Sequence, residues 1–177
     1  MMSERPGSPY RIARRAFIAA CDASGVDAIA RVQPGTAPDG KPLFMDTAAL
    51  GPRNADRAAL VIGNDVSGSE ILTGLLRAAV LPPAGMRLVL VHAPDPAAFA
   101  GVSGDRKWAH AMLGAVATED LSKVTQLSIL VAGGEDDLAR ALAAKMPDAK
   151  IRTVVLPLDF GAVREAVLAS FTLWEPQ

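Results

Sequence analysis

Apolar residues recur along this chain in two rhythms, and the alternation between them predicts the fold. A continuous apolar run, typical of a strand covered on both faces, occurs at residues 58–63, and further strands rich in apolar residues are predicted at 86–92, 127–132 and 151–156. Apolar residues at helical spacing follow these runs and predict helices at 67–80, 106–117, 135–145 and 159–173. Strands that alternate with helices become parallel neighbours joined by right-handed crossovers. The pattern therefore predicts an α/β fold, a three-layer α/β/α sandwich with a mostly parallel sheet.

The first 57 residues add further elements to this core. Residues 1–9 hold two Pro, one Gly and two Ser. We expect a disordered lead-in there, followed by a single α/β domain over residues 10–177. Residues 10–24 have helical periodicity, whereas residues 27–33 and 43–50 are expected to be strands.

Composition and charge exclude several classes of protein. The chain has 177 residues, with 18 basic and 19 acidic side chains, so it lacks the excess positive charge of a broad nucleic-acid-binding surface. The one basic cluster, Arg11, Arg14 and Arg15, is expected to be a solvated helix face. The single Cys21 cannot form an internal disulfide, which fits a reducing compartment, and its place on an apolar helix side predicts burial.

We expect a soluble cytoplasmic protein that contacts neither membrane nor nucleic acid. No export signal is visible, and no apolar stretch approaches the roughly 20 residues needed to span a bilayer. Neither a Gly-x-Gly-x-x-Gly motif nor a P-loop occurs, so nucleotide binding is not predicted. A Gly-x-Ser-x-Gly elbow followed by a His is also absent, which argues against a serine-hydrolase triad.

The most informative motif lies where an apolar strand runs into a helix, at Ile62-Gly63-Asn64-Asp65-Val66-Ser67-Gly68. It resembles the His-Gly-Asn-Glu-x-x-Gly metal loop of the zinc carboxypeptidase-like family, with Ile62 in place of the first His and Asp65 in place of the Glu. Residues 38–52 are similar to the family's preceding segment. Residues 91–100 are similar to the His-Ala-x-Asn-Pro-x-Gly-Phe-Ala stretch of a bacterial branch of uncharacterised function.

This resemblance implies a metallopeptidase-like (phosphorylase/hydrolase-like) fold, but the metal ligands differ. In the family, the first loop supplies a His and a Glu to zinc, and a later segment supplies a second His. A catalytic zinc needs about three protein ligands, yet the side chain of Ile62 has no lone pair. Only two histidines exist: we expect His92 to be structural and hydrogen-bonded, and His110 to lie on a helix surface. The sequence thus predicts a degenerate family member with no catalytic residue, no metal and no cofactor.

The leading hypothesis is a catalytically inactive domain that acts as a binding or structural module. Asn64, Asp65 and Asp95 follow neighbouring parallel strands, and open α/β sheets bind ligands at such ends. Together with Ser67 and His92, these residues form the candidate ligand-binding cleft. Ser67 is also predicted to cap the helix that follows. The expected partners are a small polar ligand, an unidentified protein or a second copy of the chain.

Two other hypotheses stay open at this stage. In one, the chain is a hydrolase of altered chemistry, with Asp65 as general base or weak metal ligand and His92 as its partner. In the other, it is an ordinary α/β domain whose resemblance to the family is accidental. Trp108 and Trp174 are candidate interface anchors, since Trp is enriched at interface hot spots, and a core role fits each of them equally well.

Overall fold

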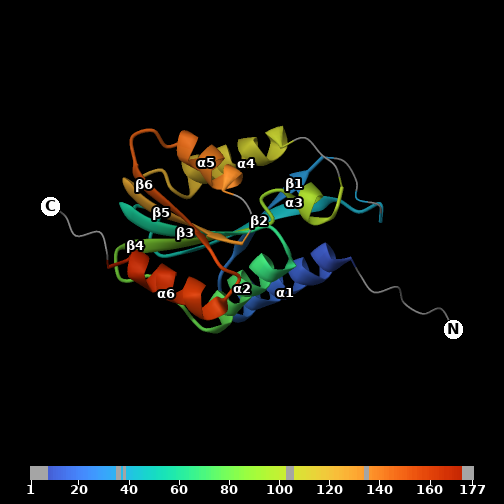
Figure 1. The fold of residues 1–177 in the computed structure, drawn as a ribbon, viewed down its shortest axis with the longest axis horizontal. Coiled ribbons are helices and arrows are strands. Elements are labelled where there is room, and N and C mark those ends of the chain that lie inside the picture. The colour runs from blue at the N-terminus through green and yellow to red at the C-terminus, as the bar shows by residue number, and fades with distance from the viewer. Residues whose placement is uncertain (1–7, 35–36, 38, 103–105, 134–135, 173–177) are drawn as a thin grey trace.

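The computed structural model of the chain describes residues 8–34, 37, 39–102, 106–133 and 136–172. Within these residues it contains six helices and six strands (Figure 1). In chain order the elements are α1 (Pro9–Ala23), β1 (Ala28–Gln33), β2 (Leu43–Leu50), β3 (Arg57–Gly63), α2 (Val66–Arg77), β4 (Met86–His92), α3 (Pro96–Phe99), α4 (Lys107–Glu119), β5 (Gln126–Ala132), α5 (Asp137–Ala144), β6 (Lys150–Leu156) and α6 (Phe160–Ser170).

One six-stranded sheet runs through the molecule in the order β1-β2-β4-β3-β5-β6. Strands β4, β3, β5 and β6 are parallel, whereas β2 is antiparallel to both β4 and β1. Helices α1, α2 and α6 cover one face of the sheet, and α4 and α5 cover the other (Figure 1). The α/β sandwich is therefore confirmed, and the antiparallel pair of β1 and β2 comes from the first 57 residues.

The central strands are buried on both faces. In β3, Leu60 and Ile62 pack with side chains of α4 and α5, while Ala59 and Val61 pack with those of α1, α2 and α6. Successive side chains of a strand point to opposite faces, so a strand covered on both sides needs apolar residues throughout. Cys21 of α1 is fully buried in the second of these layers, as predicted.

The connections around β3 create a topological switch point. Strand β3 connects through α2 to β4 on one side, whereas its other neighbour, β5, connects through α5 to β6 on the opposite side. Because α2 and α5 lie on opposite faces, the loops that leave β3 and β5 diverge at the carboxyl edge of the sheet. Open α/β sheets bind their ligands at such a point.

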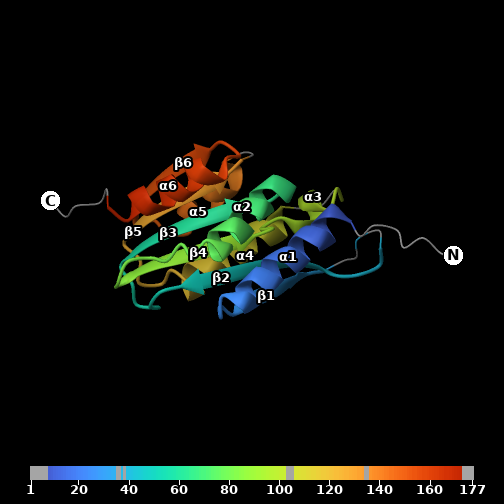
Figure 2. The ribbon, with the colours of Figure 1, turned by 90° about the horizontal axis from the view of Figure 1, so that it is seen from below.

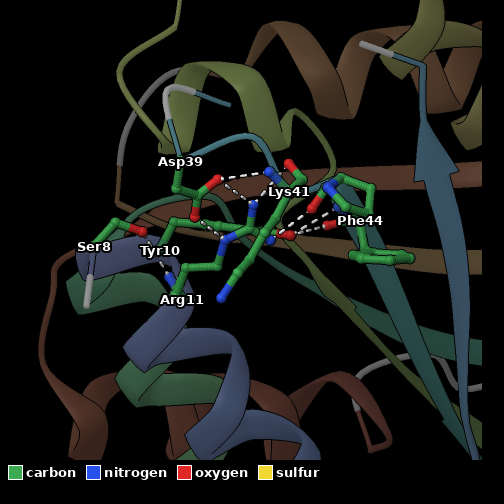
Figure 3. A network of polar contacts seen from close by, with 7 residues as sticks. Ser8, Tyr10, Arg11, Asp39, Lys41 and Phe44 are labelled. Carbon is green, nitrogen blue, oxygen red and sulfur yellow. Dashed lines mark hydrogen bonds and ion pairs between the residues drawn. The ribbon is translucent and has the colours of Figure 1, made fainter. Parts of the chain in front are cut away.

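Hydrogen bonds join the start of α1 to the β1–β2 connection and to the first residues of β2 (Figure 3). The Tyr10 hydroxyl donates to the Phe44 carbonyl oxygen at 2.8 Å and accepts from the Phe44 N–H at 2.7 Å. Arg11 donates to both carboxylate oxygens of Asp39, at 2.9 and 3.1 Å. These hydrogen bonds from Arg11 lower the pKa of Asp39. The interactions fix where α1 lies against the sheet.

The prediction that Arg11, Arg14 and Arg15 form a solvated face of α1 is wrong for two of these three residues. Arg11 pairs with Asp39, as described above. Arg14 donates to both carboxylate oxygens of Asp46, whose side chain is fully buried in β2. Only Arg15 of the cluster is exposed. The misassigned pair arises because β2 and the preceding loop bring carboxylates to this helix from about 30 residues away.

Aspartate caps set several helix boundaries. The prediction of Ser67 as the cap of α2 is wrong, because the Asp65 carboxylate caps this helix and Ser67 is an exposed residue of its first turn. The sequence did not predict α3, a short helix whose first turn is capped by Asp95. Asp159 caps α6, and this helix ends at Ser170, before the predicted end at residue 173.

Some predictions fall on residues outside the described ranges, namely most of the lead-in (1–7) and Trp174. Pro9, expected in the lead-in, is the first residue of α1, and Ser8 caps the helix. Among the described residues, no helix combines the length and apolar character required to cross a membrane.

Candidate functional site

A small cavity lies at the switch point, between the carboxyl ends of β3 and β5. It encloses about 230 Å³. Its walls come from both strands, from their loops and from the starts of α4 and α5: Ile62, Asn64, Asp65, Arg106, Val131, Gly133, Asp137 and Leu138. Larger hollows of about 660 and 540 Å³ lie at the amino ends of the parallel strands, where α/β folds do not usually place their ligand sites.

Asn64 and Asp65 connect β3 to the rest of this edge. The Asp65 side chain accepts a hydrogen bond from the Gly68 N–H at 2.6 Å, which satisfies one of the free donors at the start of α2. The Asn64 side-chain oxygen accepts from the Asp95 N–H at 2.9 Å, so the loops after β3 and β4 are joined. The structure thus brings together three of the five predicted site residues, although Asp95 does not line the cavity itself.

Arg106 places a positive charge among the carboxylates of this edge. Its Nε lies 3.2 Å from Oδ2 of Asp95, and its guanidinium also forms an ion pair with Asp137 at the start of α5. The Asp95 side chain is 7% exposed, and that of Arg106 is 41% exposed. The arginine therefore bridges acids from two different strand ends and presents the rest of its surface to the cavity and to solvent.

Sequence reasoning missed Arg106 and Asp137 as site residues. The sequence predicts only that these residues belong to the first turns of the helices at 106–117 and 135–145. The sequence gives no signal for them, because the strand order that brings the carboxyl end of β5 beside that of β3 is a property of the fold.

His92 does not line the cavity. It is fully buried on the sheet face covered by α1 and α2, with its ring stacked on Phe17 at a centroid distance of 4.7 Å. Its Nε2 lies 2.8 Å from the Ser69 hydroxyl, which itself is buried. His92 is thus a hydrogen-bonded interior residue. Neighbouring strand residue Ile62 points to the opposite face.

The polar cluster around His92 has the residue types of a hydrolase triad but not its accessibility. The His92 ring lies between the Ser69 hydroxyl and the Asp46 carboxylate. However, His92 Nδ1 is 3.8 Å from Asp46 Oδ2, which is too long for a hydrogen bond. Burial, together with the charge of Arg14, lowers the pKa of His92 to about 3. Because Ser69 is only 1% exposed, no substrate can reach its hydroxyl in this conformation.

The remaining candidate residues have structural surroundings. His110 is exposed on α4, as predicted. Burial raises the pKa of the Cys21 thiol to about 11, which keeps it protonated and unreactive. Trp108 is partly buried against the core layer beneath α4 and α5, so it contributes to the core.

The residues at the carboxyl edge do not fit a zinc ion. Ile62, at the position of the first family ligand, packs its aliphatic side chain in the core and offers no donor atom. Asp65 is engaged as a helix cap. Within the described ranges, no three His, Cys, Asp or Glu side chains come together in a way that could hold a metal.

The α/β sandwich of this chain has counterparts among solved structures. Among solved structures, glutaminyl cyclase from Porphyromonas gingivalis is similar at a TM-score of 0.56 and 11% identity, over 94% of this chain and 97% of that chain. A candidate Zn-dependent exopeptidase from Bacteroides vulgatus matches at a TM-score of 0.49 and 10% identity, over 96% of each chain. Identities this low bear on the fold alone.

The chain belongs to the family described as "Protein of unknown function (DUF2817)", whose match covers residues 7–104, more than half of the sequence. This match contains β3, the metal-loop segment and Asp95, which were the basis of the resemblance seen in the sequence. A search of curated proteins finds no match.

Proposed function

We propose that this chain is a catalytically inactive member of the zinc-peptidase-like fold that works as a binding module. The observation that supports this most strongly is Arg106, whose guanidinium pairs with Asp95 and Asp137 at the edge where a metal-dependent relative would need its cation. An arginine stays charged at all physiological pH values. The carboxylates of this edge therefore have a counter-charge from the chain itself.

The wall of the cavity supports the same proposal. Ile62 contributes hydrocarbon at the point where an imidazole would have to coordinate a metal. The alternative hypothesis, a hydrolase that uses Asp65 and His92, receives less support, because His92 is buried on the other side of the sheet and is held there by Ser69 and Phe17.

The cavity favours a small polar ligand over a partner protein as its occupant. At about 230 Å³ it is smaller than the roughly 300–1,000 Å³ typical of drug-sized ligand sites. Asn64 offers an amide, Asp65 and Asp137 offer carboxylates, and Arg106 offers donors within one small space. Such a mixture suits a compact molecule that carries both donors and acceptors.

Metal analysis tests the inactive assignment. Protein purified without chelator from zinc-supplemented culture should contain far less than one zinc per chain, and added zinc should leave its melting temperature unchanged. Stoichiometric zinc that is lost in Asp65→Ala would overturn the proposal. The Asp65→Asn variant is the control, because Asn still caps the helix while being a poorer metal ligand.

Thermal-shift measurements test the binding function. A panel of small amino acids, amines and carboxylates should include a compound that raises the melting temperature of the native chain. This shift should disappear in Arg106→Ala and persist in Arg77→Ala, which removes an exposed arginine from the other end of α2. A shift of equal size in both variants would place the binding site elsewhere.

A further inference from the structure

Strand β6 forms one edge of the sheet, opposite the edge formed by β1 (Figure 2). Within the described residues, β5 is the only strand beside it. Edge strands present unpaired backbone donors and acceptors, and such a strand is a template for pairing with another chain. In addition, strands of parallel sheets are usually covered, whereas Thr153 and Val155 of β6 are exposed.

The backbone of β6 presents three residues outward. Lys150 donates its N–H to the Thr125 carbonyl beside β5, and Leu156 accepts from the Gly133 N–H on that same side. Backbone groups of successive strand residues alternate in direction, so the even-numbered residues face β5. The N–H and C=O groups of Ile151, Thr153 and Val155 therefore point away from the sheet.

These three residues can pair with the same three residues of a second copy related by a twofold axis. If β6 pairs antiparallel with β6 of a second copy and the axis passes through Thr153, Ile151 lies opposite Val155 in both directions. Each of these pairs exchanges hydrogen bonds through its outward backbone groups. Cross-strand pairs of β-branched residues stabilise a sheet, and Val155 is 49% exposed in the single chain.

The positions of the positively charged side chains favour the register with the axis at Thr153 over the one with the axis at Arg152. With the axis at Thr153, Arg152 lies opposite Val154 and Lys150 opposite Leu156, so no two cations face each other. With the axis at Arg152, two arginines would be directly opposite, which is destabilising. The axis at Thr153 also pairs all seven residues of the strand.

We propose that two copies of this chain form a symmetric dimer through antiparallel pairing of β6, with the twofold axis at Thr153. The two sheets then join into one continuous sheet, and the interface is isologous, as in most homodimers. This interaction goes beyond the proposed binding function, because no β6 residue lines the carboxyl-edge cavity. The two proposals therefore stand or fall separately.

Molar mass in solution is the first test. Light scattering after gel filtration should give the mass of two 18.4 kDa chains at high concentration. Thr153→Pro should give the mass of one chain, because it removes an outward N–H at the axis without touching the ladder to β5. Thr153→Ala, which keeps that N–H, should remain dimeric. Circular dichroism checks that both variants fold.

A matched pair of edge valines distinguishes the two edges of the sheet. Val155 in β6 and Val32 in β1 are 49% and 54% exposed. Val155→Lys should dissociate the dimer, since it replaces the apolar cross-strand partner of Ile151 with a charged side chain, whereas Val32→Lys should leave it intact. A monomeric native chain, or a dimer lost only in Val32→Lys, would overturn the proposal.

Disulfide cross-linking tests the register. Cα atoms of a hydrogen-bonded antiparallel pair lie about 5.5 Å apart, within the roughly 4.4–6.8 Å spanned by disulfides. Thr153→Cys should therefore give a cross-linked dimer under oxidising conditions, because its copy lies directly opposite. Val155→Cys should not, since it faces Ile151 of the second copy. Cys21 is fully buried and adds no background. Efficient linkage in Val155→Cys alone would refute the register.

Discussion

Lowering the pH from about 7 to about 5 should destabilise this protein through a single interior residue, His92. The side chain is fully buried, its Nε2 bonds to Ser69, and its Nδ1 has no hydrogen-bond partner among the described groups. A proton added at Nδ1 would bring a positive charge into the core between Phe17 and the sheet. His92 is therefore harder to protonate in the folded protein than in the unfolded chain.

Two neighbouring charges act on this proton in opposite directions. The carboxylate of Asp46 lies 3.8 Å from Nδ1 and would favour the charged imidazolium. However, both oxygens of Asp46 already accept hydrogen bonds from Arg14, at 2.7 and 2.9 Å. Burial dominates and the charge of Arg14 adds to it, so the pKa of His92 is lowered to about 3.

The sign and size of the effect follow from the two pKa values. Between an unfolded value near 6.5 and a folded value of about 3, the unfolded state of His92 binds more protons. Stability is therefore lost as pH falls through this window, by up to about 1.4 kcal/mol per pH unit. Between about pH 6.5 and about pH 5 the loss amounts to roughly 2 kcal/mol, a large part of a typical 5–15 kcal/mol.

Urea unfolding followed by circular dichroism measures this loss. The native chain and His92→Gln are compared at several pH values between about 7 and 5, a range in which ordinary carboxylates stay mostly ionised. The Gln amide stays neutral and can still bond to Ser69. Burial raises the pKa of Asp120, which acts with the opposite sign, but this group is common to both proteins and cancels in the comparison.

The decisive result is the difference between the native chain and His92→Gln in how steeply the free energy of unfolding changes with pH. The native chain should lose about 2 kcal/mol more than His92→Gln over this range. The absolute stability of the variant is not the readout, since a poorer fit of Gln against Phe17 shifts all pH values alike. Equal slopes in the two proteins would refute the argument that His92 stays neutral in the folded state.

Three further substitutions test the packing around the site by urea unfolding. Arg14→Ala should cost about 3–5 kcal/mol, because it leaves the fully buried Asp46 without a counter-charge, and the double variant with Asp46→Ala should recover part of this loss. Gly63→Ala should cost about 1–3 kcal/mol, since its Cβ would lie 2.7 Å from the backbone of α2, whereas Gly114→Ala meets only a flexible lysine at 3.6 Å and should be tolerated; equal losses would contradict this. Asp65→Ala should cost about 1 kcal/mol through loss of the α2 cap, and Asp65→Asn should retain most of that stability.

The strands were predicted more accurately than the helices, for a physical reason. The central strands are rich in apolar residues, so the limits of each strand follow closely from the limits of its apolar stretch. The predicted strands 43–50 and 86–92 coincide with β2 and β4, and the other four differ from the observed strands by a single residue at the start. Helix ends depend on which side chain finds the free N–H groups, and both Asp65 and Ser67 were chemically suited to that role.

Some residues of the candidate site could be predicted from the sequence and others could not. Asn64, Asp65 and Asp95 could be predicted because each follows an apolar run, and parallel strands bring their carboxyl ends to one edge. The pairing of Arg106 with Asp137 could not, because charged residues at helix starts have the same sequence pattern whether or not they meet. His92 was placed correctly at a strand end, but the side of the sheet on which it lies becomes clear only from α1, which covers it through Phe17.

The charge balance at the carboxyl edge supports the proposed function. Asp95 is nearly buried and would be costly to leave without a positive partner. Arg106 supplies that partner from the start of α4 and joins it to Asp137 on α5, so that three segments of the edge are held together by one side chain. A divalent cation entering here would have to displace the guanidinium and would find hydrocarbon at Ile62 in place of a donor. In the proposed function, Arg106 therefore holds the carboxylates of this edge together in place of a cation.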